Sequence, residues 1–263
     1  MKRLTGLVIA AIASTPAAAA EILVLSGGAA QSPLGAALPA FEARSGHKVK
    51  IAFAPAGEIA RRVGAGEVYD LLVLPDENVE GYEKQGKAVA GSRAPLGKVG
   101  IGVAVNERAP SPDIATPESF KQALLAAKSI VYIDPARGTS GKHFAGVLQQ
   151  LGIAEAVNAK ATLGSGGYVV APVGRGEIEL GVHQITEILP VPGVKLVGPL
   201  PPALQKWTTY TAVAMPGAKS PEAARALVVF LTGPEARALF EPKGFSAPSS
   251  PRKRRLRRRF ALD

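Results

Sequence analysis

The chain has 263 residues, of which 47% are hydrophobic and 20% are charged, and it contains no cysteine. Disulfides, zinc–thiolate centres, thiol nucleophiles and lipid attachment at a cysteine are therefore excluded. The net charge of +10 is uneven, because the first twenty residues carry +2 and the tail from Pro251 carries +6, which leaves +2 for the body. A body so nearly neutral lacks the basic face of a nucleic-acid-binding protein.

The first twenty residues are typical of a secretory signal peptide. Lys2 and Arg3 precede a short apolar run over 4–13, and small residues at 18–20 form a cleavage site before Glu21. A membrane-spanning helix needs ~20 apolar residues, about twice the length of this run. We therefore predict cleavage near Ala20 and a periplasmic protein.

The other end of the chain, 246–263, is a basic tail. A segment rich in serine and proline leads into seven cationic residues over 252–259. Runs of like charge repel one another and are typical of disordered sequence. We predict that this tail lies outside the fold, and a role in anchoring the protein to a surface stays open.

Strand and helix patterns alternate from Glu21 onward. Apolar or alternating runs predict strands at 22–25, 49–53, 71–74, 99–105, 130–134, 178–182 and 208–215. Gly46 is placed to end the first helix, while Thr116 and Ser220 each precede a Pro-Glu pair and are typical helix caps. This alternation indicates an α/β fold with mostly parallel sheets.

The segment 53–75 is the most informative stretch of the chain. It contains the end of a strand, a turn of small residues, one short helix and a buried strand. The start of a helix leaves backbone N–H groups unbonded, and the helix dipole adds partial positive charge there. This pattern predicts one half of an anion pocket, with Ala56, Gly57 and Glu58 as candidate ligand-binding residues. The loop after the first strand has the same status and contributes Ser26, Gly27, Gly28 and Ala29.

The segment 137–143 is the richest in polar and glycine residues. Thr139 or Ser140 can cap the helix that follows. Alternatively, Ser140 and Gly141 offer free N–H groups to an anion, and Lys142 and His143 add charge-assisted contacts. One Gly-Lys spacing is too short a motif to indicate a nucleotide-binding loop.

Three further candidates follow later in the chain. Tyr168 follows a glycine-rich loop and can cover a ligand or pack in the core, and His183 and Gln184 end a predicted strand. The three histidines lack metal-ligand spacing, so we expect no metal and no cofactor. No Gly-x-Ser-x-Gly motif or Ser–His–Asp order indicates a hydrolase.

Taken in order, these features resemble the periplasmic molybdate-binding proteins. The resemblance implies a type II solute-binding protein of an ABC importer, a monomer with two α/β lobes and a ligand cleft between them. It places lobe one at 21–99 plus 208–245 and lobe two at 100–207, and it implies a membrane permease as partner. The segments that carry it are the loops at 26–30 and 54–57, the run ARRVGAGEVYDLLVL at 60–74, and the segments 134–143, 180–182 and 233–245.

The sequence departs from that family at three positions. Ala29 and Ala56 stand where the molybdate proteins have side-chain hydroxyls, and Gln184 stands where they have a tyrosine. Each lost donor to a buried oxyanion would cost ~1–3 kcal/mol. This difference favours an organic carboxylate over molybdate, tungstate or sulfate.

Two functions therefore stay open. The first is a periplasmic protein that binds a small anion for an ABC importer and has no catalytic residue. The second is an isomerase, because some proteins similar to this family isomerise unsaturated tricarboxylates such as aconitate. That chemistry needs a base, for which the candidates are His143 and His183, followed by Lys142 and Glu58.

Overall fold

The computed structural model describes residues 19–248. Most of the predicted signal peptide and residues 249–263 of the predicted tail lie outside these residues. Ser246, the first residue of that tail, was wrongly predicted to lie outside the fold, because its backbone pairs with Lys98. The strands are β1 (Glu21–Gly27), β2 (Lys48–Ala54), β3 (Leu71–Pro75), β4 (Ala94–Asn106), β5 (Ile130–Ile133), β6 (Ala161–Gly164), β7 (Leu180–Gln184), β8 (Val194–Pro199) and β9 (Trp207–Ala214). The α-helices are α1 (Gln31–Ser45), α2 (Ala56–Gly64), α3 (Asp76–Lys84), α4 (Pro117–Ala126), α5 (Thr139–Gln150), α6 (Ala154–Asn158), α7 (Ala171–Gly174), α8 (Ile185–Ile188), α9 (Pro221–Thr232) and α10 (Pro234–Phe240), with 3-10 turns η1 (Gly28–Ala30) and η2 (Glu241–Lys243).

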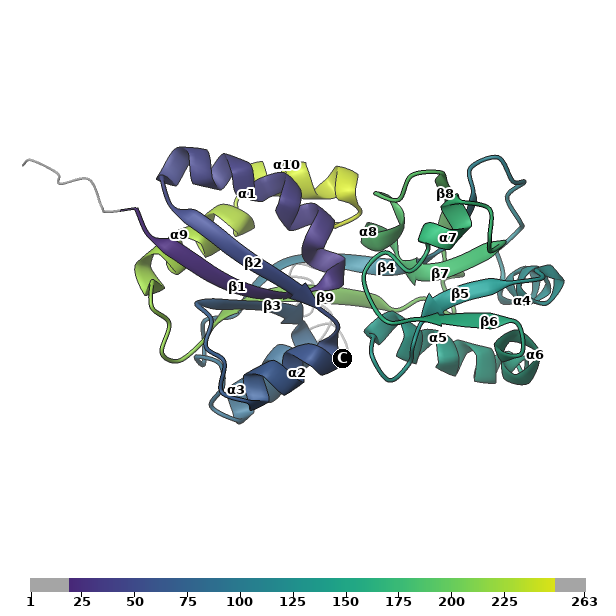
Figure 1. Ribbon diagram of the computed structural model, residues 1–263, viewed down its shortest axis with the longest axis horizontal. Coiled ribbons are helices and arrows are strands. Elements are labelled where there is room, and N and C mark those ends of the chain that lie inside the picture. Colours follow the sequence, from purple (N-terminus) through teal and green to yellow (C-terminus); the bar gives the residue numbers. More distant parts are fainter. Residues whose placement is uncertain (1–18, 249–263) are drawn as a thin grey trace, which may run out of the picture.

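These elements form two lobes side by side (Figure 1). In one lobe, β1 pairs in parallel with β2 and β3, and β3 pairs antiparallel with β9. In the other, β5 pairs in parallel with β6 and β7, while β7 and β8 both pair antiparallel with β4. The predicted two-lobed α/β fold, with sheets flanked by helices, is confirmed, but each sheet is mixed and not mostly parallel, because β4 and β9 pair antiparallel with their neighbours.

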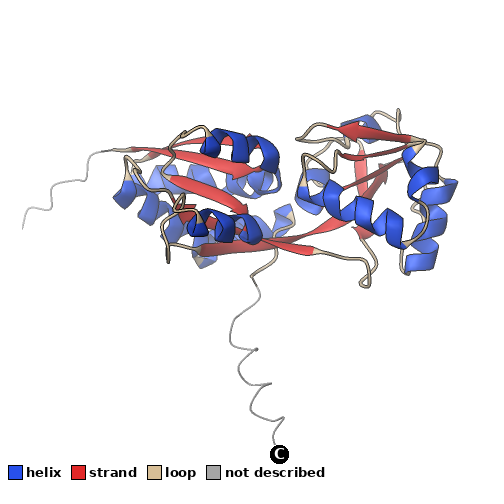
Figure 2. Cartoon of the chain, turned by 90° about the horizontal axis from the view of Figure 1, so that it is seen from below, coloured by secondary structure: helices blue, strands red, loops and turns tan. Residues whose placement is uncertain are grey.

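The strands β4 and β9 run between the lobes (Figure 2). The first half of β4, up to Gly100, pairs with β9, and its second half, from Ile101, pairs with β7 and β8. The change of partner falls where the chain leaves one sheet for the other. We therefore keep, as a proposal, the lobe limits of 21–99 plus 208–245 for lobe one and 100–207 for lobe two.

Each sheet separates two apolar cores, because successive side chains of a strand point to opposite faces. In β3, Leu71 and Val73 pack with α1, α9 and α10, whereas Leu72 and Leu74 pack with α2 and α3. The strand β5 divides its side chains between two cores in the same way. Helices on both faces explain why these strands read as short, wholly apolar runs.

The predicted helix ends are only partly right. Gly46 ends α1 in the left-handed conformation, with φ of 72°, and Thr116 caps α4 by accepting a bond from the Ser119 N–H. Ser220 is the N-cap of α9, which begins at Pro221 as predicted, but its hydroxyl donates to the Glu21 carbonyl and forms no capping bond. Neither Thr139 nor Ser140 caps α5, whose N-cap is Gly138 and forms no side-chain bond.

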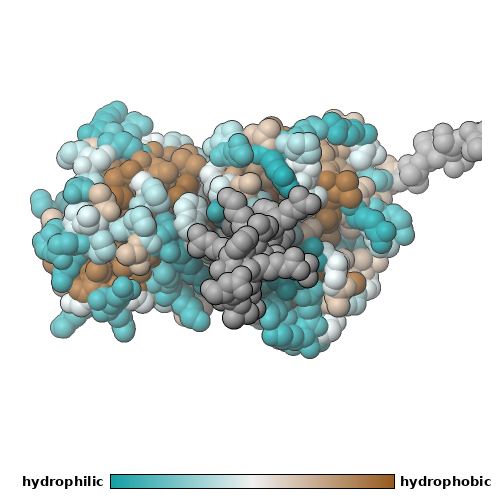
Figure 3. Space-filling model, turned by 180° about the vertical axis from the view of Figure 1, so that it is seen from behind, coloured by the Kyte–Doolittle hydropathy of each residue, from teal (hydrophilic) through white to brown (hydrophobic). Residues whose placement is uncertain are grey.

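Seen from behind, the surface mixes hydrophilic and apolar side chains on both lobes (Figure 3). Large exposed apolar residues such as Leu163, Trp207 and Val229 come from three separate elements. Within 19–248, no helix is both long enough and apolar enough to cross a membrane.

Candidate functional site

A cavity of about 270 Å³ lies between the two lobes, at the ends of five strands. Its lining includes the last residues of β1, β2 and β3 from lobe one and of β5 and β7 from lobe two. In open α/β sheets, ligands bind outside the carboxyl ends of the strands. The strand residues that line it are Gly27, Phe53, Ala54, Leu74, Pro75, Ile133, His183 and Gln184, together with Tyr210 of β9.

Helices from both lobes begin at this cavity. The first helical bonds run from the Ile59 N–H to Pro55 in α2 and from the Lys142 N–H to Gly138 in α5. The three N–H groups before each of these donors are therefore not used by the helix. The turn η1 and helix α1 begin on the same side as α2, so positive ends of helix dipoles meet here from both lobes.

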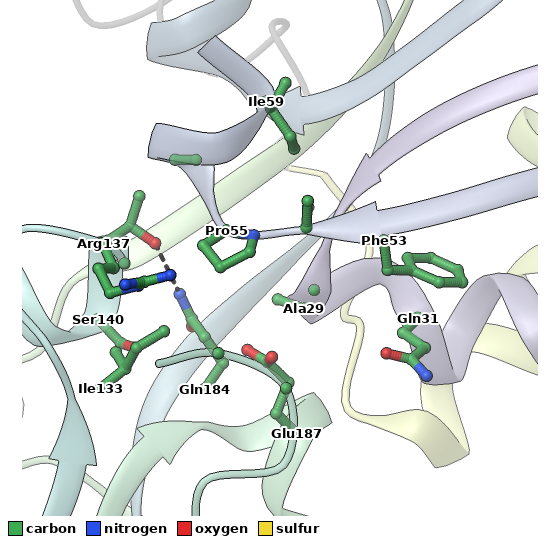
Figure 4. A pocket seen from close by; sticks show the side chains of 18 of the residues that line it. Ala29, Gln31, Phe53, Pro55, Ile59, Ile133, Arg137, Ser140, Gln184 and Glu187 are labelled. Carbon is green, nitrogen blue, oxygen red and sulfur yellow. Dashed lines mark hydrogen bonds between the residues drawn. The ribbon is translucent and has the colours of Figure 1, made fainter. Parts of the chain in front are cut away.

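Three polar side chains form a buried cluster on the lobe-two wall. The Ser140 hydroxyl lies 3.1 Å from Nδ1 of His183, and Nε2 of His183 lies 3.4 Å from Oε2 of Glu187. Nε2 also donates to the Gly167 carbonyl at 3.1 Å. Since all three side chains are more than nine-tenths buried, the cluster is shielded from bulk water. The Glu187 carboxylate points toward the space beside Ala29 and Pro55 (Figure 4).

The cluster favours a protonated imidazole. Burial disfavours its charge, but the Glu187 carboxylate and the bond to Gly167 outweigh this effect, so the pKa of His183 lies above its ordinary value. Burial and the nearby Glu187 charge raise the pKa of Tyr210, which is fully protonated at neutral pH. The wall of the cavity thus holds a carboxyl group paired with an imidazole, and a phenol.

The amide of Gln184 is the fourth polar group on this wall. Its nitrogen lies 3.4 Å from the Thr139 hydroxyl, and its oxygen has no partner among the described residues. Both Thr139 and Gln184 line the cavity.

The lobes touch each other around the cavity, and glycines occupy these contacts. A methyl group built on Gly28 would lie 2.6 Å from Oε1 of Glu187, and one on Gly166 would lie 2.8 Å from the Pro55 ring. On the α2 side, Gly57 lies next to the Ala136 carbonyl. At Gly28 and Gly166 a Cβ atom would push these side chains away, whereas at Gly57 it would make an ordinary contact.

The structure brings together eight of the residues predicted for the site and not the other six. Ser26 lies buried behind the wall, where its hydroxyl donates to Gly27, and Gly141 packs against Ile133. Tyr168 does not line the cavity and is 37% exposed. Gly57, Lys142 and His143 line a neighbouring groove instead. The eight that line the cavity are Gly27, Gly28, Ala29, Ala56, Glu58, Ser140, His183 and Gln184.

The two acidic residues of the lining differ in their partners and in their burial. Glu58 forms a bidentate salt bridge with Arg61, and this interaction lowers the pKa of the Glu58 carboxyl. Glu187 is buried and has one oxygen toward His183. Sequence reasoning named Glu58 and missed Glu187, although Glu187 follows His183 by four residues. It missed Tyr210 as well, because nothing in the sequence of β9 indicates that its tyrosine lines a cavity.

No three histidine, aspartate or glutamate side chains within 19–248 lie close enough together to hold an ion.

Two lobes, crossing strands and an anion-accepting cavity define a solute-binding protein. The model of the family described as bacterial extracellular solute-binding protein matches residues 22–246, and the chain belongs to this family. It is 34% identical over 251 residues to an aconitate isomerase from a Pseudomonas species, covering 91% of this chain and 95% of that protein. It is 27% identical to the molybdate-binding protein ModA of Azotobacter vinelandii, covering 93% of this chain and 97% of that protein.

Solved structures share the fold. The periplasmic molybdate-binding protein of Azotobacter vinelandii superposes with a TM-score of 0.74 at 19% identity, covering 87% of this chain and 100% of that chain. The sulfate-binding protein SubI of Mycobacterium tuberculosis gives a TM-score of 0.69 at 17% identity, covering 92% of each chain. The expected resemblance to molybdate-binding proteins is confirmed.

Proposed function

We propose that the cavity binds a small organic anion with several carboxylates and that the protein isomerises an unsaturated tricarboxylate of the aconitate type. The observation that carries this proposal is Glu187, a buried carboxylate with one oxygen toward His183 and a side chain that faces the cavity. The 34% identity to an aconitate isomerase supports it.

A carboxylate in the lining of a cavity repels bound anions, so it is disfavoured in a site whose sole role is to bind them. Two like charges about 4 Å apart repel by roughly 4 kcal/mol at an effective dielectric constant of about 20. A proton on His183, which its raised pKa favours, offsets this repulsion, so the pair can be kept without expelling the ligand. Such an acid–base pair inside an anion cavity is suited to proton transfer.

Glu187 is a better base than His183. Both ring nitrogens of His183 are occupied, Nδ1 by Ser140 and Nε2 by Gly167 and Glu187. The imidazole therefore positions and balances the carboxylate instead of meeting the ligand. His143, the other histidine among the candidate bases, donates to the Leu204 carbonyl and does not line the cavity.

The reaction can be written with one base. The Glu187 carboxylate takes a proton from the CH₂ carbon of the unsaturated acid, and the electron pair of that C–H bond forms a new C=C bond while negative charge spreads into the neighbouring carboxylate. Unbonded N–H groups at the starts of α2 and α5 stabilise that charge. Glu187 then returns the proton to the carbon at the other end of the former double bond. The double bond has moved and the enzyme is unchanged.

The size of the cavity agrees with this class of ligand. Its volume of about 270 Å³ corresponds to roughly nine waters at ~30 Å³ each. A tetrahedral oxyanion would leave much of this space empty. The side chains of Ala29 and Ala56 offer such an ion no hydroxyl donors, and this also supports an organic carboxylate.

A second candidate is a binding protein that delivers the same anion to an ABC importer. Membership of the solute-binding family and the relationship to ModA favour it. In this case Glu187 only shapes the site. Both candidates are consistent with export to the periplasm.

The deciding experiment incubates the purified protein with trans-aconitate and follows the ultraviolet spectrum. We expect turnover, and we expect Glu187→Gln to lower kcat by ~10²–10⁴-fold, the usual contribution of a general base. Glu222→Gln, an acid exposed on α9, is the matched control and should leave turnover unchanged. Binding of trans-aconitate without turnover would replace the isomerase by the second candidate.

A further inference from the structure

A groove of about 690 Å³ adjoins the ligand cavity. On the lobe-one side it is lined by the starts of α2 and α3, and on the lobe-two side by the loop 135–138 and one face of α5. It shares Ala56 and the segment 137–139 with the cavity. The groove therefore lies directly outside the line along which the lobes meet.

That line is thin. Gly57 and the Ala136 carbonyl, which lie next to each other across the lobes, both line the groove. No side chain of Gly57 stands between groove and cavity. A small separation of the lobes at Gly57 and Ala136 would join the two spaces.

The groove is cationic. Arg137 and Lys142 are exposed and form no ion pair with any residue in 19–248, whereas Lys206 is paired with Glu77 at 3.0 Å. The Arg137 guanidinium donates to the Ser165 carbonyl, which holds this charge at the edge of the cavity. The His143 ring donates to Leu204. Among the described residues, Lys142 thus lacks an acidic partner, whereas the Arg137 charge is partly balanced by Glu58, whose pKa Arg61 and, more weakly, Arg137 lower.

We propose that this groove is an encounter site that collects polycarboxylate ligands and delivers them to the cavity when the lobes separate. The inference rests on the proposed function, since it needs an anionic ligand. Cations beside a cleft raise the association rate of anions, and this effect weakens as salt screens it. Lys142 acts here at a distance and never touches the bound ligand.

The test measures association of trans-aconitate by stopped flow, using the intrinsic fluorescence of the wild-type protein and its variants. Lys142→Gln should slow association by roughly 2–5-fold at about 10 mM salt, and adding Arg137→Gln should slow it further. At about 0.5 M salt the association rates of Lys142→Gln and wild type should converge. The dissociation rate of Lys142→Gln should equal that of wild type.

The matched control is Lys121→Gln with Arg225→Gln, which removes the same charge from α4 and α9, away from the groove. It should leave the association rate unchanged at both salt concentrations. Three results would overturn the encounter site alone. They are an association rate in Lys142→Gln equal to that of wild type, the same slowing of association in the control variant, and a change in Lys142→Gln that affects only the dissociation rate. Failure of the wild-type protein to bind trans-aconitate would overturn the proposed function and the encounter site with it.

Discussion

Ser140, His183 and Glu187 show what burial does to a charged group. A buried carboxylate or imidazolium is stable only when it is paired and hydrogen bonded. Here each ring nitrogen of His183 has a partner, and one oxygen of Glu187 faces the ring. A proton on His183 balances a charge on Glu187, so the cavity can hold a base without becoming strongly repulsive to anions.

The pH dependence of stability should report this pair. Burial opposes the charge of His183, but Glu187 and Gly167 raise its pKa above the ordinary 6.5. A raised pKa in the folded state stabilises the protein fully below about 6.5, and this contribution is lost as the pH rises through the folded-state value. Melting temperatures measured from about pH 5.5 to about pH 9 should therefore fall over this upper window.

The matching variant is Glu187→Gln, which keeps the shape of the side chain and removes its charge. Its melting temperature should fall less across the same pH window, because the main favourable charge next to His183 is gone. An identical pH profile for both proteins would contradict the assigned pairing.

At the scale of elements, the contact between η1 and α8 closes one side of the cavity. The helix α8 follows β7 of lobe two, yet Ile185 packs against the core of lobe one and Glu187 lies against Gly28. In Figure 1, α8 lies at the edge of its lobe that faces the other lobe. The element that carries the proposed base is thus also a junction between the lobes.

Gly28→Ala should impair this junction. The new methyl group would lie 2.6 Å from Oε1 of Glu187, so the carboxylate must leave His183 or the lobes must separate. We expect turnover of trans-aconitate to fall by at least about 10-fold and the free energy of unfolding to fall by roughly 1–3 kcal/mol, because a close contact with a buried side chain must be relieved.

Gly35→Ala is the control for that variant. Gly35 lies inside α1, and a methyl group there would meet nothing within 4 Å. Alanine should raise the free energy of unfolding by about 0.5–1 kcal/mol and leave turnover unchanged. Wild-type turnover in Gly28→Ala would show that the contact between η1 and α8 is dispensable.

At the scale of the molecule, the chain builds a cavity from two lobes that strands β4 and β9 connect. A ligand that touches both lobes binds best when they are together. Such binding to the folded state alone raises stability by mass action. An anion that fits should therefore increase the melting temperature, and one that does not fit should leave it unchanged.

A melting screen against anions should separate carboxylates from metal oxyanions. Trans-aconitate at about 100 times its Kd should add about 2.7 kcal/mol of stability. For a protein of this size that corresponds to a rise in Tm of roughly 5–10 °C. Molybdate and sulfate should give little change, because Ala29 and Ala56 lack donors. A strong shift with molybdate at micromolar concentration would contradict the argument from the missing hydroxyls.

Several features were predictable because they depend on neighbours in sequence. Short, continuous apolar runs predicted β3 and β5, and Gly46 and Thr116 marked helix ends by local geometry. The loops after β1 and β2 were predicted at the cavity, since parallel strands bring their carboxyl ends to one edge. The sequence by itself determined the α/β lobes and half of the anion cavity.

Other features depend on which face of an element meets which neighbour, and only the tertiary structure decided them. Ser140 and Lys142 are two residues apart on α5, about 200° around a helix axis, so one enters the cavity and the other the groove. Glu187 becomes the partner of His183 because the chain turns from β7 directly into α8. No sequence pattern predicted this turn. Tertiary packing therefore moved Lys142 and His143 out of the cavity and placed Glu187 and Tyr210 in it.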